Sequence, residues 1–214
     1  MNAYTFTFAG QPLLALPSGA LHWPDRQLLI VSDLHLGKSE RLARRGGTLL
    51  PPYETRETLT RLSDDLDRTG AKSVISLGDS FDDLAAAGTL DDADHMTLTR
   101  LMAGRDWIWV EGNHDAGPFA LGGTHRADVT LGPIALRHIA TLQTPEISGH
   151  YHPKARIGRT TRRCFLIDAH RIILPAYGAY TGGLSCDDQA LRTLLAPNAI
   201  AVLTGTKAIP CPMP

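Results

Sequence analysis

Short apolar runs alternate with amphipathic stretches through the first half of the chain. Residues 28–31, 74–77 and 107–110 are almost entirely apolar, as expected for strands that are buried on both faces. Residues 53–68 and 90–102 carry apolar side chains at spacings of three and four, and this pattern predicts helices. The order strand, helix, strand, helix, strand indicates a largely parallel sheet with right-handed crossovers.

Strands of a different kind are predicted toward both ends of the chain. Residues 4–8 alternate between aromatic and threonine side chains, which predicts a strand. In the second half the strand-like runs are short and tightly connected, which indicates a second, mixed or antiparallel sheet. These runs cover residues 127–131, 134–138, 164–168 and 172–174. Ser185 and Asp188 resemble a capping box that opens a helix through Leu195. We therefore expect an α/β fold of two sheets with helices outside.

The composition is that of an ordinary soluble globular protein. Hydrophobic residues make up 43% of the chain and charged residues 20%, and we expect a single domain over residues 1–214. The N-terminus lacks the features of a signal peptide, and no stretch approaches the roughly 20 apolar residues of a membrane span. The three cysteines lack zinc-knuckle spacing, so we expect a reduced, cytoplasmic protein without a membrane partner. A net charge of −1 provides no global basic field, although a local patch would serve a nucleic acid.

Each buried strand of the first half ends in a polar cluster. Asp33 and His35 follow the first strand, Asp79 follows the second, and Asn113 and His114 follow the third. Because ligand sites in open α/β sheets form beyond the carboxyl ends of the strands, we expect these side chains to meet. The second half adds three candidate histidines: His138, His150 and His152.

This set combines carboxylates, an amide oxygen and imidazoles. Such a mixture suits Mn²⁺, Fe, Ni²⁺ or Zn²⁺ better than Ca²⁺, which prefers oxygen ligands alone. In Asp33-x-His35 and His150-x-His152, the paired side chains point the same way at the end of a strand, so both reach one metal cluster. Each motif alone is a weak signal, because a single histidine is more often a surface residue. The whole set in this order favours a metal centre.

The order of these motifs resembles the calcineurin-like metallophosphoesterase superfamily, whose pattern is Asp-x-His, Gly-Asp, Gly-Asn-His-Asp/Glu, an isolated His and Gly-His-x-His. The resemblance implies a four-layer α/β/β/α sandwich of two mixed sheets and a two-metal phosphoesterase. Mn²⁺ is the expected metal, with Fe, Ni²⁺ or Zn²⁺ as alternatives. By this resemblance, Asp33, His35 and His152 would bind one metal, and Asn113, His138 and His150 would bind the other. Asp79 would bridge the two. His114 would contact the scissile phosphate and assist the leaving group.

Flanking segments resemble, more narrowly, the bacterial ligase-associated DNA damage response metallophosphoesterases. These segments are Trp23-Pro24, residues 28–38 and residues 175–184. The resemblance implies an endonuclease that hydrolyses phosphodiester bonds in DNA, which we expect to be single-stranded. It also implies a role in DNA repair beside an ATP-dependent DNA ligase and a helicase.

Asp82 departs from that narrower pattern, in which many members are expected to carry histidine. An aspartate there resembles the phosphatase-type pattern, in which it orients the histidine of Gly-Asn-His, so Asp82 would hold His114 as an imidazolium. A solvated loop acid is the alternative. Asp82 and the absence of net positive charge favour a second function, a phosphatase or phosphodiesterase acting on a small nucleotide-like substrate. A third function, a protein-binding scaffold, is disfavoured by the intact ligand set.

Several further side chains have more than one interpretation. His125 is a phosphate contact, a substitute ligand or an ordinary loop histidine. Three tyrosines either stack on a base or sugar or pack within the protein: Tyr151, Tyr177 and Tyr180. A basic run after the first motif either tracks a nucleic-acid backbone or forms a solvated helix face: Lys38, Arg41, Arg44 and Arg45.

Overall fold

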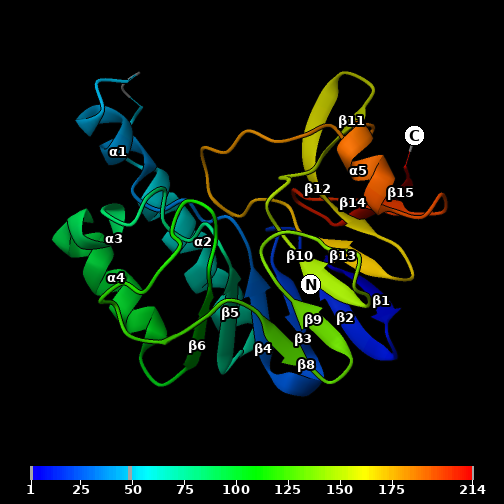
Figure 1. Ribbon diagram of the computed structural model, residues 1–214, viewed down its shortest axis with the longest axis horizontal. Coiled ribbons are helices and arrows are strands. Elements are labelled where there is room, and N and C mark those ends of the chain that lie inside the picture. The colour runs from blue at the N-terminus through cyan, green and yellow to red at the C-terminus, as the bar shows by residue number, and fades with distance from the viewer. Residues whose placement is uncertain (1, 48–49, 214) are drawn as a thin grey trace.

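Two β-sheets packed face to face form the centre of the computed structural model, which describes residues 2–47 and 50–213 (Figure 1). The first sheet has the strand order β1 (Tyr4–Phe8), β2 (Gln11–Ala15), β3 (Leu21–Trp23), β4 (Leu28–Val31), β5 (Ser73–Leu77), β6 (Asp106–Val110) and β7 (Thr124–Arg126). The second has the order β15 (Ile209–Pro212), β14 (Ile200–Leu203), β12 (Thr160–Ile167), β13 (Arg171–Ile173), β10 (Glu146–Ser148), β9 (Ile134–Leu136) and β8 (Val129–Leu131), and β11 (Lys154–Ile157) pairs with β12.

The first sheet is parallel where the sequence predicts it. Strands β4 to β7 run parallel, and Ile30, Ile75 and Ile108 are neighbours across this part of the sheet. Strands β1 to β4 form an antiparallel meander that continues the sheet on its other side. The carboxyl ends of β4, β5 and β6 therefore lie at one edge, where the polar clusters follow them.

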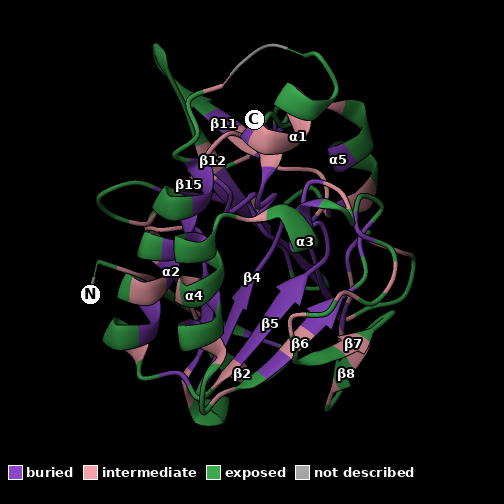
Figure 2. Ribbon diagram, turned by 90° about the vertical axis from the view of Figure 1, so that its left-hand side faces the viewer, coloured by how far each residue is buried: buried purple, intermediate pink, exposed green. Residues whose placement is uncertain are grey.

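Helices α2 (Glu54–Thr69) and α4 (Asp92–Met102) cover the outer face of the first sheet (Figure 2). Both begin slightly later than predicted. The carboxylate of Asp91 accepts a hydrogen bond from the backbone N–H of Asp94 and so caps α4. Their inward leucines pack on the strands in one core cluster. The other helices in this half of the chain are short: η1 (Pro24–Arg26), α1 (Lys38–Arg44) and α3 (Ala86–Thr89).

The second sheet is mixed, since β9, β10 and β13 run parallel and its other pairings are antiparallel. Apolar side chains of both sheets meet in a central core cluster. A third cluster joins the outer face of the second sheet to α5 (Gln189–Leu194). Three apolar layers between four layers of structure confirm the predicted α/β/β/α sandwich.

Boundaries in the second half differ from the prediction. Of the run predicted as one strand over residues 127–131, only residues 129–131 form a strand, β8, because residues 127–128 connect β7 in the first sheet to β8 in the second. Strand β9 ends at Leu136, so His138 lies in a loop. The N-cap of α5 is Asp188, whose side chain accepts from the backbone N–H of Ala190; the proposed cap at Ser185 is therefore wrong.

Among residues 2–47 and 50–213, no helix has the combination of length and apolar character that crossing a bilayer requires.

The segment that follows β13 of the second sheet is hydrogen-bonded to the loop after β4 of the first sheet and to α2, beside the metal-ligand motifs. The backbone N–H of Tyr177 donates to the carbonyl of Ser32 over 2.8 Å, and that of Gly178 donates to the carbonyl of Asp33 over 3.0 Å. The hydroxyl of Tyr177 donates to the buried carboxylate of Asp65 in α2 over 2.9 Å. Tyr177 is fully buried, so it packs within the protein and does not stack on a ligand.

We predict that Tyr177→Phe lowers the free energy of unfolding by about 1–3 kcal/mol, because the carboxylate of Asp65 loses a buried donor. Urea denaturation followed by circular dichroism measures the change. Tyr53→Phe is the matched control, since Tyr53 is 63% exposed and should leave stability unaltered. Equal stabilities for the two variants would contradict the anchoring role.

Candidate active site

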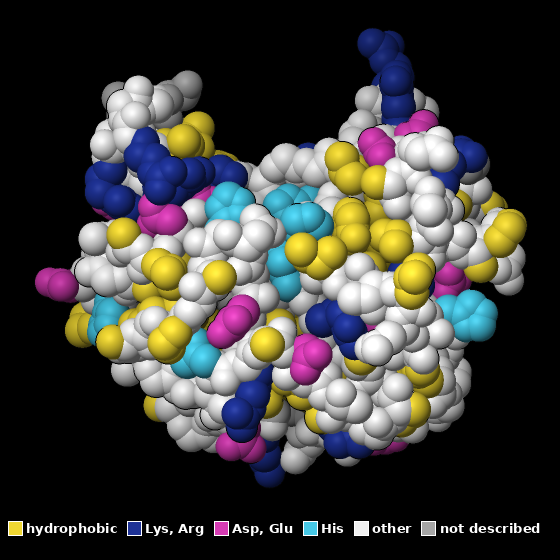
Figure 3. Space-filling model, viewed as in Figure 1, with side chains coloured by type: hydrophobic (Ala, Val, Ile, Leu, Met, Phe, Trp, Pro, Cys, Tyr) yellow, Lys and Arg dark blue, Asp and Glu magenta, His cyan; other side chains and the backbone are white. Residues whose placement is uncertain are grey.

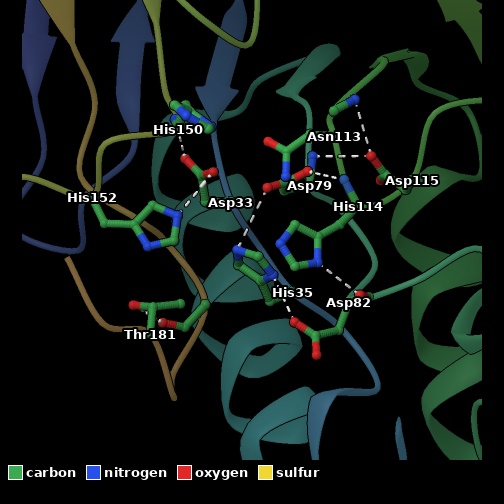
Figure 4. Close-up of polar contacts among 12 residues, drawn as sticks. Asp33, His35, Asp79, Asp82, Asn113, His114, Asp115, His150, His152 and Thr181 are labelled. Carbon is green, nitrogen blue, oxygen red and sulfur yellow. Dashed lines mark hydrogen bonds and ion pairs between the residues drawn. The ribbon is translucent and has the colours of Figure 1, made fainter.

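The side chains singled out in the sequence lie together in loops at one edge of the two sheets (Figure 4). Asp33 and His35 follow β4, Asp79 and Asp82 follow β5, and Asn113 follows β6. The others lie in adjoining loops: His114 next to Asn113, His138 after β9, and His150 and His152 between β10 and β11. Residues from both sheets thus converge on one place.

One cluster consists of Asp33, His35 and His152, whose ligand atoms all lie within 4.8 Å of one another. Oδ1 of Asp33 and Nε2 of His152 are 3.0 Å apart. These two atoms and Nε2 of His35 are buried, and none has a hydrogen-bond partner within residues 2–47 and 50–213. Leaving such atoms unsatisfied costs about 1–3 kcal/mol each. A carboxylate oxygen and two imidazole nitrogens that converge in this way fit a divalent transition metal.

A second cluster consists of Asp79, His138 and His150. The amide oxygen of Asn113 lies 3.0 Å from Nε2 of His138, which brings a fourth donor to the same point. Oδ2 of Asp79 lies 3.4 Å from Nε2 of His138 and 3.9 Å from Nε2 of His35. Asp79 therefore stands between the two clusters, as a bridging ligand would.

Hydrogen bonds to Nδ1, on the side of the ring away from the ligand atom Nε2, fix the rings of His35 and His138. Nδ1 of His138 lies 2.8 Å from the carbonyl oxygen of Leu77, and Nδ1 of His35 lies 2.8 Å from Oδ1 of Asp82. A ring that donates its Nδ1–H in this way presents the lone pair of Nε2 to a metal. The arrangement fixes both the tautomer and the orientation of these imidazoles.

Asp82 contacts different groups from those predicted. Its carboxylate, only 1% exposed, accepts hydrogen bonds from His35 and Arg41 and lies 3.9 Å from Nζ of Lys38. His114 instead has its Nδ1 3.0 Å from the backbone carbonyl of Asp82. The expected carboxylate–imidazole bond to His114 is therefore wrong, as is the solvated loop acid. Burial acts to raise the pKa of the Asp82 carboxyl. The hydrogen bond and charge of His35, with the charges of Lys38 and Arg41, outweigh this effect and lower that pKa.

The basic side chains in and just after α1 form ion pairs with acidic side chains of the protein. Besides the contacts of Lys38 and Arg41 with Asp82, Arg44 pairs with Glu40 and Asp83, and Arg45 pairs with Asp83. The positive charge of this helix is thus largely balanced within the protein.

Backbone conformation at the site is unusual. Five of its non-glycine residues have positive φ angles between 46° and 71°: Asp33, His35, Asp79, His150 and His152. Such left-handed conformations cost of order 1–3 kcal/mol each and persist only where the surroundings impose them. Here the left-handed conformations bend the loops sharply and turn the five side chains toward the site. The strained backbone positions are therefore the ones that carry candidate metal ligands.

Two glycines of the motifs are required by close approach. A β-carbon on Gly112 would lie 2.1 Å from the backbone nitrogen of Asp79, and one on Gly149 would lie 1.7 Å from Oγ of Ser32. The loops carrying Asp33, Asp79 and the second-half histidines can therefore contact one another directly.

Asp115 is a supporting residue to which the sequence assigns no role. Its buried carboxylate accepts backbone N–H bonds of 2.7–3.1 Å from Asp79, Ser80, Phe81 and Gly112. It thereby ties the loop of the bridging aspartate to the loop of Asn113 and His114. The only sequence signal for this residue is that the motif Gly-Asn-His is followed by an acid.

His125 lies outside the ligand clusters found among the described residues. Its ring packs edge-on against Phe119, with centroids 4.5 Å apart, which favours the structural interpretation. Tyr151 is partly buried and its ring lies 5.1 Å from that of His150. Tyr180 is partly buried as well.

The acids and imidazoles shift one another's pKa values. Burial favours the neutral acid of Asp79, yet the hydrogen bond and charge of His138, with the backbone N–H of His114, lower its pKa to about 2. Burial likewise opposes the charged ring of His138, but Asp79 and Asp33 raise its pKa to about 9. In the metal-free protein at neutral pH, a proton therefore occupies His138 where a metal would bind.

Comparisons with known proteins agree with this geometry. No protein-family model matches the chain, and no curated protein matches it by sequence. The crystal structure of the nuclease MPE from Pseudomonas putida is similar, with a TM-score of 0.75 and 28% identity over 98% of this chain and 100% of that one. The phosphoesterase YfcE from E. coli gives a TM-score of 0.42 and 13% identity over 87% of this chain and 99% of that one, too distant to bear on function.

The likeness to the nuclease spans nearly the whole of both chains. With the buried histidine and aspartate clusters, it shows a hydrolase that resembles that nuclease, consistent with the calcineurin-like metallophosphoesterase type. The fold and the clusters together indicate divalent metal ions as cofactors.

We predict that Asp115→Asn weakens metal binding by roughly 10–100-fold although Asp115 is no ligand, because outer-shell partners orient the ligands. The side-chain amide of the introduced asparagine would also direct its N–H groups at backbone N–H groups, so that donors would face donors. Competition with a fluorescent chelator measures the affinity, and circular dichroism verifies folding. The control is Asp128→Asn on the exposed surface, and equal affinities in the two variants would contradict the role.

We also predict that metal binding to the wild-type protein at pH 7 releases about one proton more than binding to His138→Asn. His138, with its pKa of about 9, must lose a proton before it can coordinate a metal, so the excess disappears as the pH rises through that value. Calorimetric titration with Mn²⁺ in buffers of different ionisation enthalpy counts the protons. His125→Asn should behave as the wild type, and an unchanged count in His138→Asn would refute the assignment.

Proposed function

We propose that this chain is a two-metal phosphodiesterase that cuts single-stranded DNA internally. The observation that carries the proposal is the meeting of two ligand clusters at Asp79, whose carboxylate lies between His35 and His138. The likeness to the nuclease MPE supports a nucleic acid as substrate, and the sequence resemblance to ligase-associated enzymes supports DNA. On the same resemblance we propose a cytoplasmic role in DNA repair beside an ATP-dependent DNA ligase and a helicase.

Seven side chains would hold the two metal ions. The first ion would be held by Asp33, His35 and His152, the second by Asn113, His138 and His150, and both by Asp79. Mn²⁺ is our first candidate, and Fe, Ni²⁺ and Zn²⁺ suit the same donors. When bound, such ions would activate a water molecule and withdraw charge from the phosphoryl oxygens.

His114 is the proposed catalytic residue. Its ring lies beside that of His35, with centroids 5.1 Å apart, and its Nδ1 is engaged with the carbonyl of Asp82. Nε2 is therefore the atom offered to a substrate, and in the protonated ring it can donate to the departing oxygen. Asp82 acts as a positioning residue, because it holds His35 through its carboxylate and His114 through its backbone.

The shape of the surface supports an extended substrate. Figure 3 shows histidine side chains on the floor of a hollow between two projections, which correspond to α1 and the β11–β12 hairpin of Figure 1. A hollow that is open between two walls admits a chain that enters on one side and leaves on the other.

One observation favours the second candidate, hydrolysis of a small nucleotide-like phosphoester. The cations of α1 nearest the site, Lys38 and Arg41, are paired with Asp82, so this wall offers little free charge to a polymer.

The test is hydrolysis with added Mn²⁺ by the wild type and Asp79→Ala. We expect the wild type to cleave bis-p-nitrophenyl phosphate and circular single-stranded DNA, which has no ends. Asp79→Ala should lose on the order of 10³-fold or more in rate, because both ions lose their shared ligand. Cleavage of p-nitrophenyl phosphate with intact DNA would favour the small-molecule function, and inactivity with every tested metal would favour a scaffold.

His114→Asn serves as the internal control for metal binding. It should retain the metal content of the wild type while its turnover falls roughly 10²–10⁴-fold, as for loss of a general acid. Full turnover in this variant would remove His114 from the chemistry.

A further inference from the structure

The β11–β12 hairpin carries a concentration of positive charge that nothing in the catalytic site uses. Its residues 154–163 include five cations and no acidic residue, in a chain whose net charge is −1: Lys154, Arg156, Arg159, Arg162 and Arg163. In the part of the chain that the structure describes, no carboxylate forms an ion pair with any of them. This differs from α1 across the hollow, whose cations are paired with acids.

The hairpin begins at the metal ligands. Strand β11 starts two residues after His152, and Nζ of Lys154 donates to the carbonyl of Thr181 over 3.3 Å. Figure 4 shows Thr181 close to His152 and His35. At about 3.3 Å for each residue, Ile157 at the end of β11 lies up to about 16 Å beyond His152. Dark-blue side chains rise at the tip of this projection in Figure 3.

The pairing of the hairpin divides its cations between two faces. Lys154 pairs with Arg163 and Arg156 pairs with Thr161, so these residues share one face. That face is directed toward the segment beside the site, because Lys154 bonds Thr181, and Arg163 donates to the carbonyls of Ala176 and Ala179.

The other face points away from the site. Arg162 pairs with Ala155, which packs in the core cluster that contains α5. Arg159 lies in the exposed turn between the strands. Of the exposed arginines, Arg156 on the site-facing side and Arg159 at the tip are therefore the ones that can reach a ligand in the hollow. Nε of Arg156 donates to the carbonyl of Gly158 over 3.0 Å, so its terminal nitrogens are the donors it offers.

We propose that Arg156 and Arg159 bind the phosphodiester backbone of the strand that extends from the metal site. This inference rests on the proposed function and names the part of the protein that holds a polymer but not a small substrate. Guanidinium groups bind phosphate oxygens through paired N–H donors, and contacts of this kind position a strand without reading its sequence. The distance from His152 places these contacts several nucleotides from the bond that is cut.

The experiment compares Arg156→Gln/Arg159→Gln with a control that removes the same charge. The control is Arg162→Gln/Lys207→Gln, which alters the opposite face of the hairpin and an exposed lysine after β14. Both are assayed with Mn²⁺ on a 30-nucleotide single strand and on bis-p-nitrophenyl phosphate. We expect the test variant to raise the KM for the 30-nucleotide strand about tenfold, with kcat/KM for the small diester within twofold of the wild type.

Salt dependence gives a second readout. Loss of two phosphate contacts should reduce the slope of log binding constant against log salt by roughly 1.4 for a single strand, measured by fluorescence anisotropy in EDTA. The control should keep the slope of the wild type. Equal KM values and slopes in the two variants would overturn the inference while leaving the nuclease function intact. A wild type that cleaves the small diester but no strand would overturn the proposed function, and the inference with it.

Discussion

Three buried ligand atoms that face one another determine much of the surrounding structure. Oδ1 of Asp33 and Nε2 of His35 and His152 converge without hydrogen-bond partners in the described chain, an arrangement that is unfavourable unless a cation satisfies it. Other groups on Asp33 and His35 are engaged, and Nδ1 of His35 is bonded to Asp82. Oδ2 of Asp33, for example, accepts from Ser32 and from the backbone of His150. In Asp33 and His35 the hydrogen bonds thus leave free the atoms that a metal would use, and the backbone is left-handed at five positions of the site.

Much of the fold follows from patterns that are local in the sequence. Strands over residues 4–8 and 28–31 occur as predicted, because alternation and continuous apolar runs reflect how many faces of a strand are buried. The pattern fails where tertiary structure redirects the chain. The strand predicted over residues 134–138 ends at Leu136, and the chain then turns so that His138 enters the site.

The candidate ligands were predictable because each follows a strand, and parallel strands bring their carboxyl ends together. What the sequence does not contain is the direction of each supporting side chain. Asp82 is within reach of two histidines and several cations, and only the folded loops decide that its carboxylate meets His35 and its carbonyl meets His114. The four backbone donors of Asp115 come mostly from a loop more than 30 residues earlier, a relation that no local spacing records.

The segment that crosses from β13 to Ser32 and Asp33 also has a consequence for the timing of synthesis. The ribosome completes Asp33 early, but His152 must follow 119 residues later, and the backbone of Tyr177 and Gly178 fastens over the Asp33 loop only after that. Since chains emerge from the N-terminus at roughly 5–20 residues per second, the loop that carries Asp33 waits on the order of ten seconds for His152 to be synthesised. Until then the cluster of Asp33, His35 and His152 cannot form, because one of its three members has not been made.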